Sequence, residues 1–522
     1  MKNICVISSV CLPVLCFSYS VFPELTNVEI GGKLEIYGAT YFNWIEPSEL
    51  ERIPSSALVW RSIGPNGTYS PYRTGKGAED CSFFEQRTRV HIKAGFTEDV
   101  IFFVEFDNYD VWGEDFRSQD YIPGIDRRSE SIDDVEIFQS FIEINNLYGT
   151  SGLSLSIGRQ TIDLGSGWLV GSDPGPDPFA GLSFDALRVK YTKEQFSLDV
   201  FYSKLWESFG SFNHDDIDFG RTYLTLNNVA DFVNIDVYYF LLRDDRKLEA
   251  TVGEIFRELF ENLFDRDQVS TTYIHTLGLR LYGEHSGFDY DIEIAYQLGH
   301  GSHPGLLFIP VEGIYGDDEV QWSLPAGHFE LGYTFSESKM QPRLYLGGSY
   351  YGGKDKRDIS FEDWLFRISG GRASYSFNRL FSSYREDNFI DISAMTNFWK
   401  VYSGATCNVN ESTELGIEVM YLQTVSPFDS PVSLDIGNQQ VYIFGPLSFI
   451  TRENSKDIGW QTLVYINYSL TEDFSIELGW AHFFVGDGLA EGSFIDSNGT
   501  DFISTKSTDD TDLVYFYSSI EF

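Results

Sequence analysis

The most constraining feature of the chain is an alternation of apolar and polar residues that begins near residue 33 and recurs to the C-terminal end. Each run covers about ten residues, the length of a membrane-spanning strand, and a turn separates it from the next. Within one such run, Leu277, Leu279 and Leu281 alternate with small or polar residues. A period of two indicates β-strands with one apolar face. The alternation therefore predicts an all-β chain.

The connections between these runs alternate between short and long. Eight are tight turns, near residues 97–99, 148–152, 192–195, 227–231, 284–287, 336–340, 410–413 and 471–473. Nine are long, at residues 45–82, 113–134, 164–182, 207–218, 244–271, 299–325, 354–396, 426–457 and 487–510. Short turns at one end and long loops at the other are typical of bacterial outer-membrane barrels. We therefore predict an antiparallel transmembrane β-barrel of about 18 strands, with short periplasmic turns and long extracellular loops.

The parity of each strand predicts which residues face lipid and which face the lumen. In the first strand, Leu34 and Ile36 fall on one face, and Glu35 and Tyr37 fall on the other. Lipid-facing positions of such barrels are apolar, so we assign the first pair to lipid. A barrel of this size leaves an aqueous channel unless loops fold inward. Five tryptophans near predicted strand ends are expected in the aromatic girdle at the membrane boundary: Trp44, Trp112, Trp168, Trp460 and Trp480.

Residues 1–20 have the features of a secretory signal peptide. Lys2 gives the positive start, residues 4–17 are mostly apolar, and the segment ends in a Ser-Tyr-Ser cleavage site. Its apolar stretch is too short to span a bilayer. We therefore expect residues 21–522 to form the barrel.

The composition excludes several other classes of protein. Asp and Glu number 78 against 37 Lys and Arg, and the net charge of −41 excludes a basic nucleic-acid binder. No stretch after the signal peptide approaches the roughly 18 uninterrupted apolar residues of a transmembrane helix. Cleavage leaves only Cys81 and Cys407, which excludes a disulfide scaffold and predicts two free thiols.

Several short motifs resemble those of the alginate export family of outer-membrane barrels. They are RTR at 87–89, GRQ at 158–160, LGSGWLVG at 164–171, SFDALR at 183–188, FNRLF at 377–381 and TNF at 396–398. The resemblance implies an 18-strand barrel through which an anionic polysaccharide diffuses outward. It also implies an electropositive lumen lined by arginines.

Inward-pointing cations are the candidate solute-binding residues. The set is Arg87, Arg89, Lys93, Arg159, Arg188, Lys190, Arg280, Arg343 and Arg379. Guanidinium groups bind carboxylates in bidentate fashion, which suits an anionic solute. The lumen face also carries acidic residues, so its charge is mixed: Glu105, Asp107, Glu143, Asp199, Asp236, Asp291, Glu293, Glu330, Glu418 and Glu477.

The second predicted strand holds the densest group of these cations. Arg87, Arg89 and Lys93 share one face there with His91. They either contact the solute or pair across strands. A turn centred on residue 98 would place Arg89 opposite Asp107 and His91 opposite Glu105.

Arg159 departs from the simple parity. Strict alternation places it on the same face as Leu155 and Ile157, toward lipid. A β-bulge at Gly158 would turn it inward, and we predict that bulge. Otherwise Arg159 extends along the membrane boundary to reach water.

Two of the long loops have distinctive patterns. Residues 354–396 are less acidic than the other loops and rich in aromatic residues, so this loop either folds inward as a constriction or caps the barrel. Residues 249–264 show apolar residues at helical spacing, which predicts an amphipathic loop helix.

Motifs for catalysis or metal binding are missing or incomplete. The sequence has no nucleophile elbow, P-loop or zinc-protease motif. His300 and His303 lack a third ligand, and residues 496–501 lack the distal Glu of a calcium loop. We therefore expect no enzyme activity, metal or cofactor.

The first functional hypothesis is a passive channel of the bacterial outer membrane, with selectivity set by lumen charge. The alternatives are a general or cation-tolerant porin for ions and small sugars, and a closed adhesive barrel. Expected partners are outer-membrane lipid, lipopolysaccharide, and the barrel assembly machinery, which would bind the C-terminal strand ending at Phe522.

Overall fold

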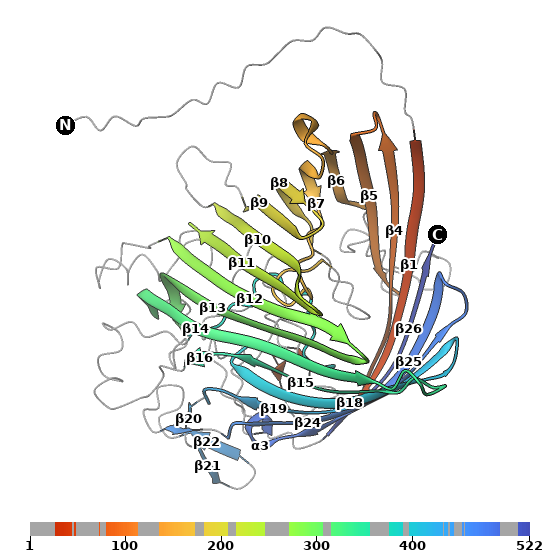
Figure 1. Ribbon diagram of the computed structural model, residues 1–522. Coiled ribbons are helices and arrows are strands. Elements are labelled where there is room, and N and C mark those ends of the chain that lie inside the picture. Colours follow the sequence, from red (N-terminus) through yellow and green to blue (C-terminus); the bar gives the residue numbers. More distant parts are fainter. Residues whose placement is uncertain are drawn as a thin grey trace, which may run out of the picture.

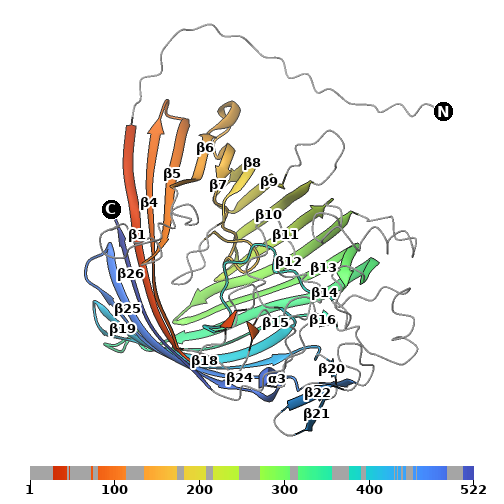
Figure 2. The same ribbon diagram turned by 180° about the vertical axis from the view of Figure 1, so that it is seen from behind.

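A computed structural model gives the fold of the chain (Figures 1 and 2). It describes residues 27–43, 46–47, 72–73, 80–112, 135–172, 182–206, 216–245, 271–305, 315–354, 375–389, 396–427, 429–431, 433–436, 439–442, 451–453, 455–490 and 510–522. The predicted signal peptide and the predicted helix at 249–264 lie outside these residues. In the described part of the chain, no helix is long and apolar enough to cross a membrane.

Eighteen strands form one closed antiparallel barrel, as the alternation predicted. They are β1 (Asn27–Phe42), β4 (Cys81–Gly95), β5 (Val100–Val111), β6 (Glu136–Ile144), β7 (Leu153–Gln160), β8 (Phe184–Thr192), β9 (Phe196–Trp206), β10 (Ile217–Ala230), β11 (Val233–Asp244), β12 (Thr272–His285), β13 (Phe288–Gly305), β14 (Tyr315–Thr334), β15 (Arg343–Tyr351), β18 (Phe398–Asn410), β19 (Thr413–Thr424), β24 (Asp457–Ser469), β25 (Phe474–Val485) and β26 (Thr511–Glu521). Each strand pairs with its neighbour in the chain, and β1 pairs with both β4 and β26. Figure 1 shows this closure, with β1 in red beside β26 in blue.

Short elements lie in the connections between barrel strands. They are β2 (Glu46–Pro47), β3 (Tyr72–Arg73), β16 (Gly353–Lys354), β17 (Tyr375–Ser376), β20 (Asp429–Pro431), β21 (Ser433–Ile436), β22 (Gln439–Tyr442), β23 (Thr451–Glu453), the 3-10 helix Leu147–Gly149 and α3 (Asp487–Ala490). The eight strands β2, β3, β16, β17, β20, β21, β22 and β23 form two-stranded pairs outside the barrel sheet.

The connections follow the predicted alternation of short turns and long loops. The β12–β13 hairpin turns at Ser286 and Gly287, whose φ angles of 52° and 85° match a type I′ turn. One predicted loop, 299–325, is mostly strand, because β13 and β14 keep pairing as far as Gly305 and Tyr315. Strands that extend beyond the lipid need no apolar face, so alternation does not mark their ends.

The two faces of the barrel have the predicted characters. Ile30 and Ile417 point outward and are 67% and 51% exposed, whereas Glu35 and Tyr37 are buried inside. Of the predicted girdle tryptophans, Trp112, Trp460 and Trp480 are exposed. Trp44 lies outside the described residues. The girdle prediction is wrong for Trp168, which is fully buried inside the barrel because its loop folds inward.

Glycines on the inner face make room for tyrosine rings of the adjacent strand. A Cβ atom at Gly278 would lie 1.9 Å from Cζ of Tyr238. The same arrangement recurs at four other inner-face glycines: Gly347 under Tyr402, Gly404 under Tyr345, Gly416 under Tyr465, and Gly479 under Tyr515. These glycines therefore allow large rings to lie flat on the wall.

We expect Gly278→Ala to lower the free energy of unfolding by about 1–3 kcal/mol, because the new methyl group displaces the Tyr238 ring. Urea unfolding of the folded barrel in detergent, followed by electrophoretic mobility, measures the change. Gly220→Ala is the matched control, since its Cβ would meet only Phe201 O at 3.9 Å. Equal losses in the two variants would contradict this account.

Candidate functional site

Two long loops fold into the barrel and pair with each other. Their described parts, residues 161–172 and 375–389, are called the inner loops. Val170 and Phe381 form a parallel bridge. Phe381 N donates to Leu169 O at 3.0 Å, and Gly171 N donates to Phe381 O at 2.9 Å. The described part of loop 354–396 thus folds inward, the first of its two predicted alternatives.

The inner loops are anchored on the wall that β13, β14, β15 and β18 form. The indole N–H of Trp168 donates to the Tyr351 hydroxyl at 2.6 Å. That hydroxyl donates to Glu386 Oε1 at 2.5 Å. The amide of Gln297 donates to Asn378 O at 2.7 Å and accepts from Asn378 N at 2.8 Å. These contacts fix both inner loops relative to the barrel.

A buried ion pair completes this anchor. Lys400 Nζ lies 2.9 Å from Glu386 Oε2, and neither side chain is more than 5% exposed. Burial alone would raise the pKa of Glu386, but the charges of Lys400 and Arg379 hold that pKa at about 2. Glu386 is therefore an anion at neutral pH.

Aromatic packing joins the inner loops to the opposite side of the lumen. The Phe381 ring lies 4.8 Å from the Phe219 ring and 5.2 Å from the Phe184 ring. Both partners are inner-face residues, on β10 and β8, and both are buried. The inner loops therefore reach from β8 and β10 to β18, and the apolar core of the molecule lies inside the barrel.

The cations of β4 form the cross-strand pairs that were one of their two predicted roles. Arg89 lies opposite Asp107, and His91 lies opposite Glu105. Arg87 binds both carboxylate oxygens of Asp107, at 3.1 Å and 2.6 Å from two of its nitrogens. Arg87 and Arg89 are both buried. A role for them in solute binding stays a prediction.

A ring under these arginines comes from a β-bulge on β6. The register with β5 shifts between Ile137 and Gln139, which leaves Phe138 as the extra residue. Its ring lies 4.2 Å from the Arg89 guanidinium carbon and 5.1 Å from that of Arg87. A cation–π contact at these distances holds both guanidinium groups against the wall.

A second group of cations, called the cationic cluster, surrounds Asp199. Arg188 NH2 lies 2.7 Å and Arg221 NH2 lies 3.1 Å from Asp199 Oδ2. Lys190 lies opposite Asp199 in the register. Lys190 is exposed and the Arg188 side chain is 20% exposed, while Arg221 is buried over the Phe201 ring. Two arginines thus share one carboxylate, and a lysine lies on the strand opposite it.

The remaining predicted cations are already engaged. Arg280 pairs with Asp291, and Arg343 lies 2.6 Å from both Asp289 and Glu330. Arg379 is buried within an inner loop and donates to Tyr384 O. Lys93 is half-exposed and lies 3.4 Å from Glu29. These residues shape the lumen charge, and their contact with a solute stays a prediction.

The predicted bulge at Gly158 is wrong. β7 keeps an unbroken register with β8, in which Ile157 lies opposite Leu187 and Arg159 opposite Asp185. Arg159 therefore shares the outer face with Ile157, which is 48% exposed. Its guanidinium binds the two oxygens of Asp185 at 2.8 Å and 2.9 Å, so the charge is paired on the outside of the barrel.

The other side of the lumen carries tyrosine–carboxylate pairs. Seven inner-face tyrosines donate to carboxylates at 2.6–3.2 Å, and we call this set the tyrosine–carboxylate wall: Tyr223–Asp236, Tyr238–Glu293, Tyr402–Glu330, Tyr345–Glu418, Tyr465–Glu414, Tyr515–Glu477 and Tyr517–Glu35. A tyrosine hydroxyl stabilises a carboxylate by a hydrogen bond without cancelling its charge. The lumen therefore carries charges of both signs, with the cationic cluster on β8–β10 and the tyrosine-bonded carboxylates on strands from β11 round to β1, where Arg280, Arg343 and Lys400 also lie.

A comparison with protein families identifies the family of the chain. A family model described as alginate export matches residues 70–499. The chain belongs to the alginate export family. The match includes both inner loops and the cationic cluster, and the family and the fold are those of outer-membrane channels. The LGSGWLVG and FNRLF motifs, which lie far apart in the chain, are the segments that meet in the lumen.

Several solved barrel structures are similar to this chain at low sequence identity. OccAB1 of Acinetobacter baumannii is 11% identical, covers 96% of this chain and 98% of its own, and has a TM-score of 0.50. A BenF-like porin from Pseudomonas fluorescens Pf-5 is 8% identical, with 95% and 99% coverage and a TM-score of 0.48. OprD of Pseudomonas aeruginosa is 10% identical, with 96% and 95% coverage and a TM-score of 0.46. No curated protein matches the chain.

Proposed function

We propose that the chain is a passive diffusion channel for an anionic polysaccharide or another negatively charged solute. The cationic cluster is the observation that carries this proposal. Arg188 and Arg221 bind the carboxylate of Asp199, Lys190 lies opposite it in the register, and Arg188 and Lys190 are open to the lumen. Such groups bind carboxylates through charge-assisted hydrogen bonds. Diffusion along them needs no nucleotide or cofactor.

The alginate export family supports the same class of solute, since alginate is a polymer of sugar carboxylates. A chain of carboxylates can exchange one cationic contact for the next as it moves. Because each contact is exposed and weak, a solute can also leave it. The inner loops narrow the path, so the solute passes close to the wall.

The tyrosine–carboxylate wall favours a second candidate function, a porin for cations or neutral sugars. Three of its carboxylates, Glu418, Glu414 and Glu477, accept from neutral tyrosine hydroxyls, and no lysine or arginine of the described residues lies within ion-pair distance of them. A negative lumen attracts cations and repels polyanions. The two functions predict opposite ion selectivity.

Single-channel recording in a planar bilayer, with a potassium chloride gradient and added polyuronate, tests the proposal. We expect anion selectivity and block by polyuronate. In an Arg188→Gln, Lys190→Gln variant the block should be about tenfold weaker, since each exposed charge contact contributes about 0.5–1 kcal/mol. Asp199 keeps Arg221 as its partner in this variant.

An Arg159→Gln, Lys193→Gln variant is the matched control. It removes two positive charges, as the test variant does. Neither residue lines the lumen, because Arg159 lies on the outer face of β7 and Lys193 bonds to Ser151 O at the turns. Its block should equal that of the unsubstituted chain. Cation selectivity without block would contradict the proposal and support the second candidate. Zero conductance would contradict both.

We also propose that the barrel resides in the bacterial outer membrane, in contact with lipopolysaccharide, and that the assembly machinery binds its C-terminal strand. Phe522 is 69% exposed, and its backbone N–H and C=O pair with Gly32 at 3.0 Å and 2.9 Å. An exposed terminal ring beside the barrel seam is open to a partner. Removal of Phe522 should lower the yield of folded barrel in bacterial outer membranes, measured by mobility in gels without heating.

A further inference from the structure

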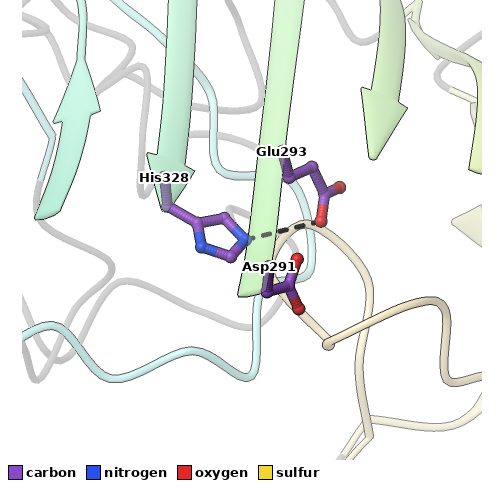
Figure 3. A group of neighbouring side chains, drawn as sticks. All are labelled: Asp291, Glu293 and His328. Atoms are coloured by element: carbon purple, nitrogen blue, oxygen red, sulfur yellow. Dashed lines mark ion pairs between the residues drawn. The ribbon is translucent and has the colours of Figure 1, made fainter. Parts of the chain in front are cut away.

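A histidine and two carboxylates converge beneath the inner loops. Asp291 and Glu293 lie on β13, and His328 lies opposite Glu293 on β14. One ligand atom from each of the three residues lies within 4.8 Å of the others. Figure 3 shows the imidazole pointing at the two carboxylates. Three potential metal-ligating groups thus face one another.

The imidazole has no hydrogen bond to explain its position. His328 is 4% exposed, and neither ring nitrogen has a hydrogen-bond partner among the described residues. Its Nε2 lies 3.5 Å from Glu293 Oε2. Rings of Trp168 and Tyr384, from the two inner loops, flank it with centroids 5.0 Å and 5.3 Å away. A buried polar group without a partner is costly, so a bound group is expected.

The 3.5 Å separation fits two ligands of one metal ion. With metal–nitrogen and metal–oxygen bonds of about 2.0–2.2 Å, two tetrahedral ligands lie about 3.4 Å apart. Among the described residues, Glu293 Oε2 lies 3.5 Å from Ser166 Oγ, at the limit of a hydrogen bond, and 3.8 Å from Arg280 Nε. The other oxygen of Glu293 accepts from Tyr238 at 2.7 Å, which orients the carboxylate as a second partner orients a metal ligand.

The net charge of the surrounding side chains also favours a divalent cation. Asp236, Asp291 and Glu293 supply three negative charges, and Arg280 is the one arginine or lysine within ion-pair distance of them among the described residues. Counting these carboxylates and Arg280 alone, the group carries an excess of two negative charges. Uncompensated buried charge destabilises a fold, and one divalent ion would balance it.

We propose that Asp291, Glu293 and His328 bind a divalent transition-metal ion, with Zn²⁺ as the best-suited probe. One imidazole and two carboxylates favour such an ion over Ca²⁺ or Mg²⁺, which prefer oxygen ligands alone. Both oxygens of Asp291 accept from Arg280, which orients the carboxylate, and its side chain is 25% exposed, so the ion has a route from the lumen. The sequence motifs did not predict this site.

The test uses the full mature chain, folded in detergent and stripped of metal with EDTA. Equilibrium dialysis against Zn²⁺, followed by elemental analysis, should give about one ion per barrel. His328→Ala and Glu293→Gln should each reduce this to near zero. Co²⁺ should give visible absorption bands in the unsubstituted chain that both variants lose. Electrophoretic mobility without heating verifies that each variant is folded, and His328→Gln replaces His328→Ala if the latter is not.

Two control variants remove the same groups elsewhere. His275→Ala deletes an imidazole whose Nδ1 bonds to the Tyr239 hydroxyl, and Glu418→Gln alters a carboxylate bonded to Tyr345. Both should keep one Zn²⁺ ion. The proposal is overturned if the unsubstituted chain binds no Zn²⁺, or if binding persists in His328→Ala and Glu293→Gln. It is also overturned if only His482→Ala, which removes the imidazole beside Asp512, abolishes binding.

Discussion

Lys400→Met should lower the free energy of unfolding by about 3–5 kcal/mol, because it leaves the Glu386 carboxylate buried without its ammonium partner. Glu386 is fully buried and bonds to Ser349 and Tyr351 on β15, so the uncompensated charge destabilises the anchor of the inner loop itself. We expect this loop to leave the wall. Single-channel conductance should then rise above that of the unsubstituted chain, and residues 375–389 should become sensitive to protease.

Two further variants distinguish the effect of the unpaired buried charge from the effect of losing a lysine side chain. Lys193→Met removes a lysine whose ammonium bonds to a turn carbonyl, Ser151 O, and lies over the Tyr191 ring, without a buried carboxylate partner among the described residues. It should leave stability and conductance nearly unchanged. In the Lys400→Met, Glu386→Gln double variant the buried charge is also gone, so the loss should be smaller than in Lys400→Met alone. Similar behaviour of Lys400→Met and Lys193→Met would show that the pair does not anchor the loop.

Trp168→Ala should cost about 3–5 kcal/mol, the usual loss when a buried tryptophan leaves a cavity. The indole is fully buried, lies against His328, Tyr351 and Phe377, and donates a hydrogen bond to Tyr351. Its removal takes away the ring contacts of inner loop 161–172 with His328 and Tyr351 on the wall. Urea unfolding followed by circular dichroism measures the loss, and single-channel recording should show a larger and more variable conductance.

Trp480→Ala serves as the comparison for Trp168→Ala. Trp480 is 44% exposed on the outer face, so its removal opens no cavity inside the barrel. We expect a smaller loss of stability and an unchanged conductance. If both tryptophan variants change conductance equally, Trp168 does not position the inner loop.

Much of the barrel could be predicted from the sequence because its determinants are local. Alternation and turn spacing give the strand count, and the turn near residue 98 fixes Arg89 opposite Asp107. Bulges are harder to predict from the sequence, because they depend on how a strand pairs with its neighbour. Gly158 suggested a bulge, but its backbone instead packs closely on β6, where a Cβ would lie 2.3 Å from Ser140 O. A bulge does occur on the neighbouring strand, at Phe138 of β6.

The interior could not be predicted in the same way, because its contacts join distant segments. Val170 and Phe381 are 211 positions apart, and no periodic signal connects their loops. Arg221 was missed because it follows a long predicted loop, although Phe219 and Tyr223 share its parity. His328 becomes a candidate ligand only once the register places it opposite Glu293.

The seam between β1 and β26 has a consequence for how the protein is made. It joins residues such as Lys33 and Glu521, so this edge of β1 has no partner until β26 has been synthesised. Until then, β1 and its neighbours present unpaired backbone groups, which in other proteins recruit further strands and cause aggregation. The unfinished sheet must therefore be kept apart from its own copies until β26 arrives to cover the open edge of β1.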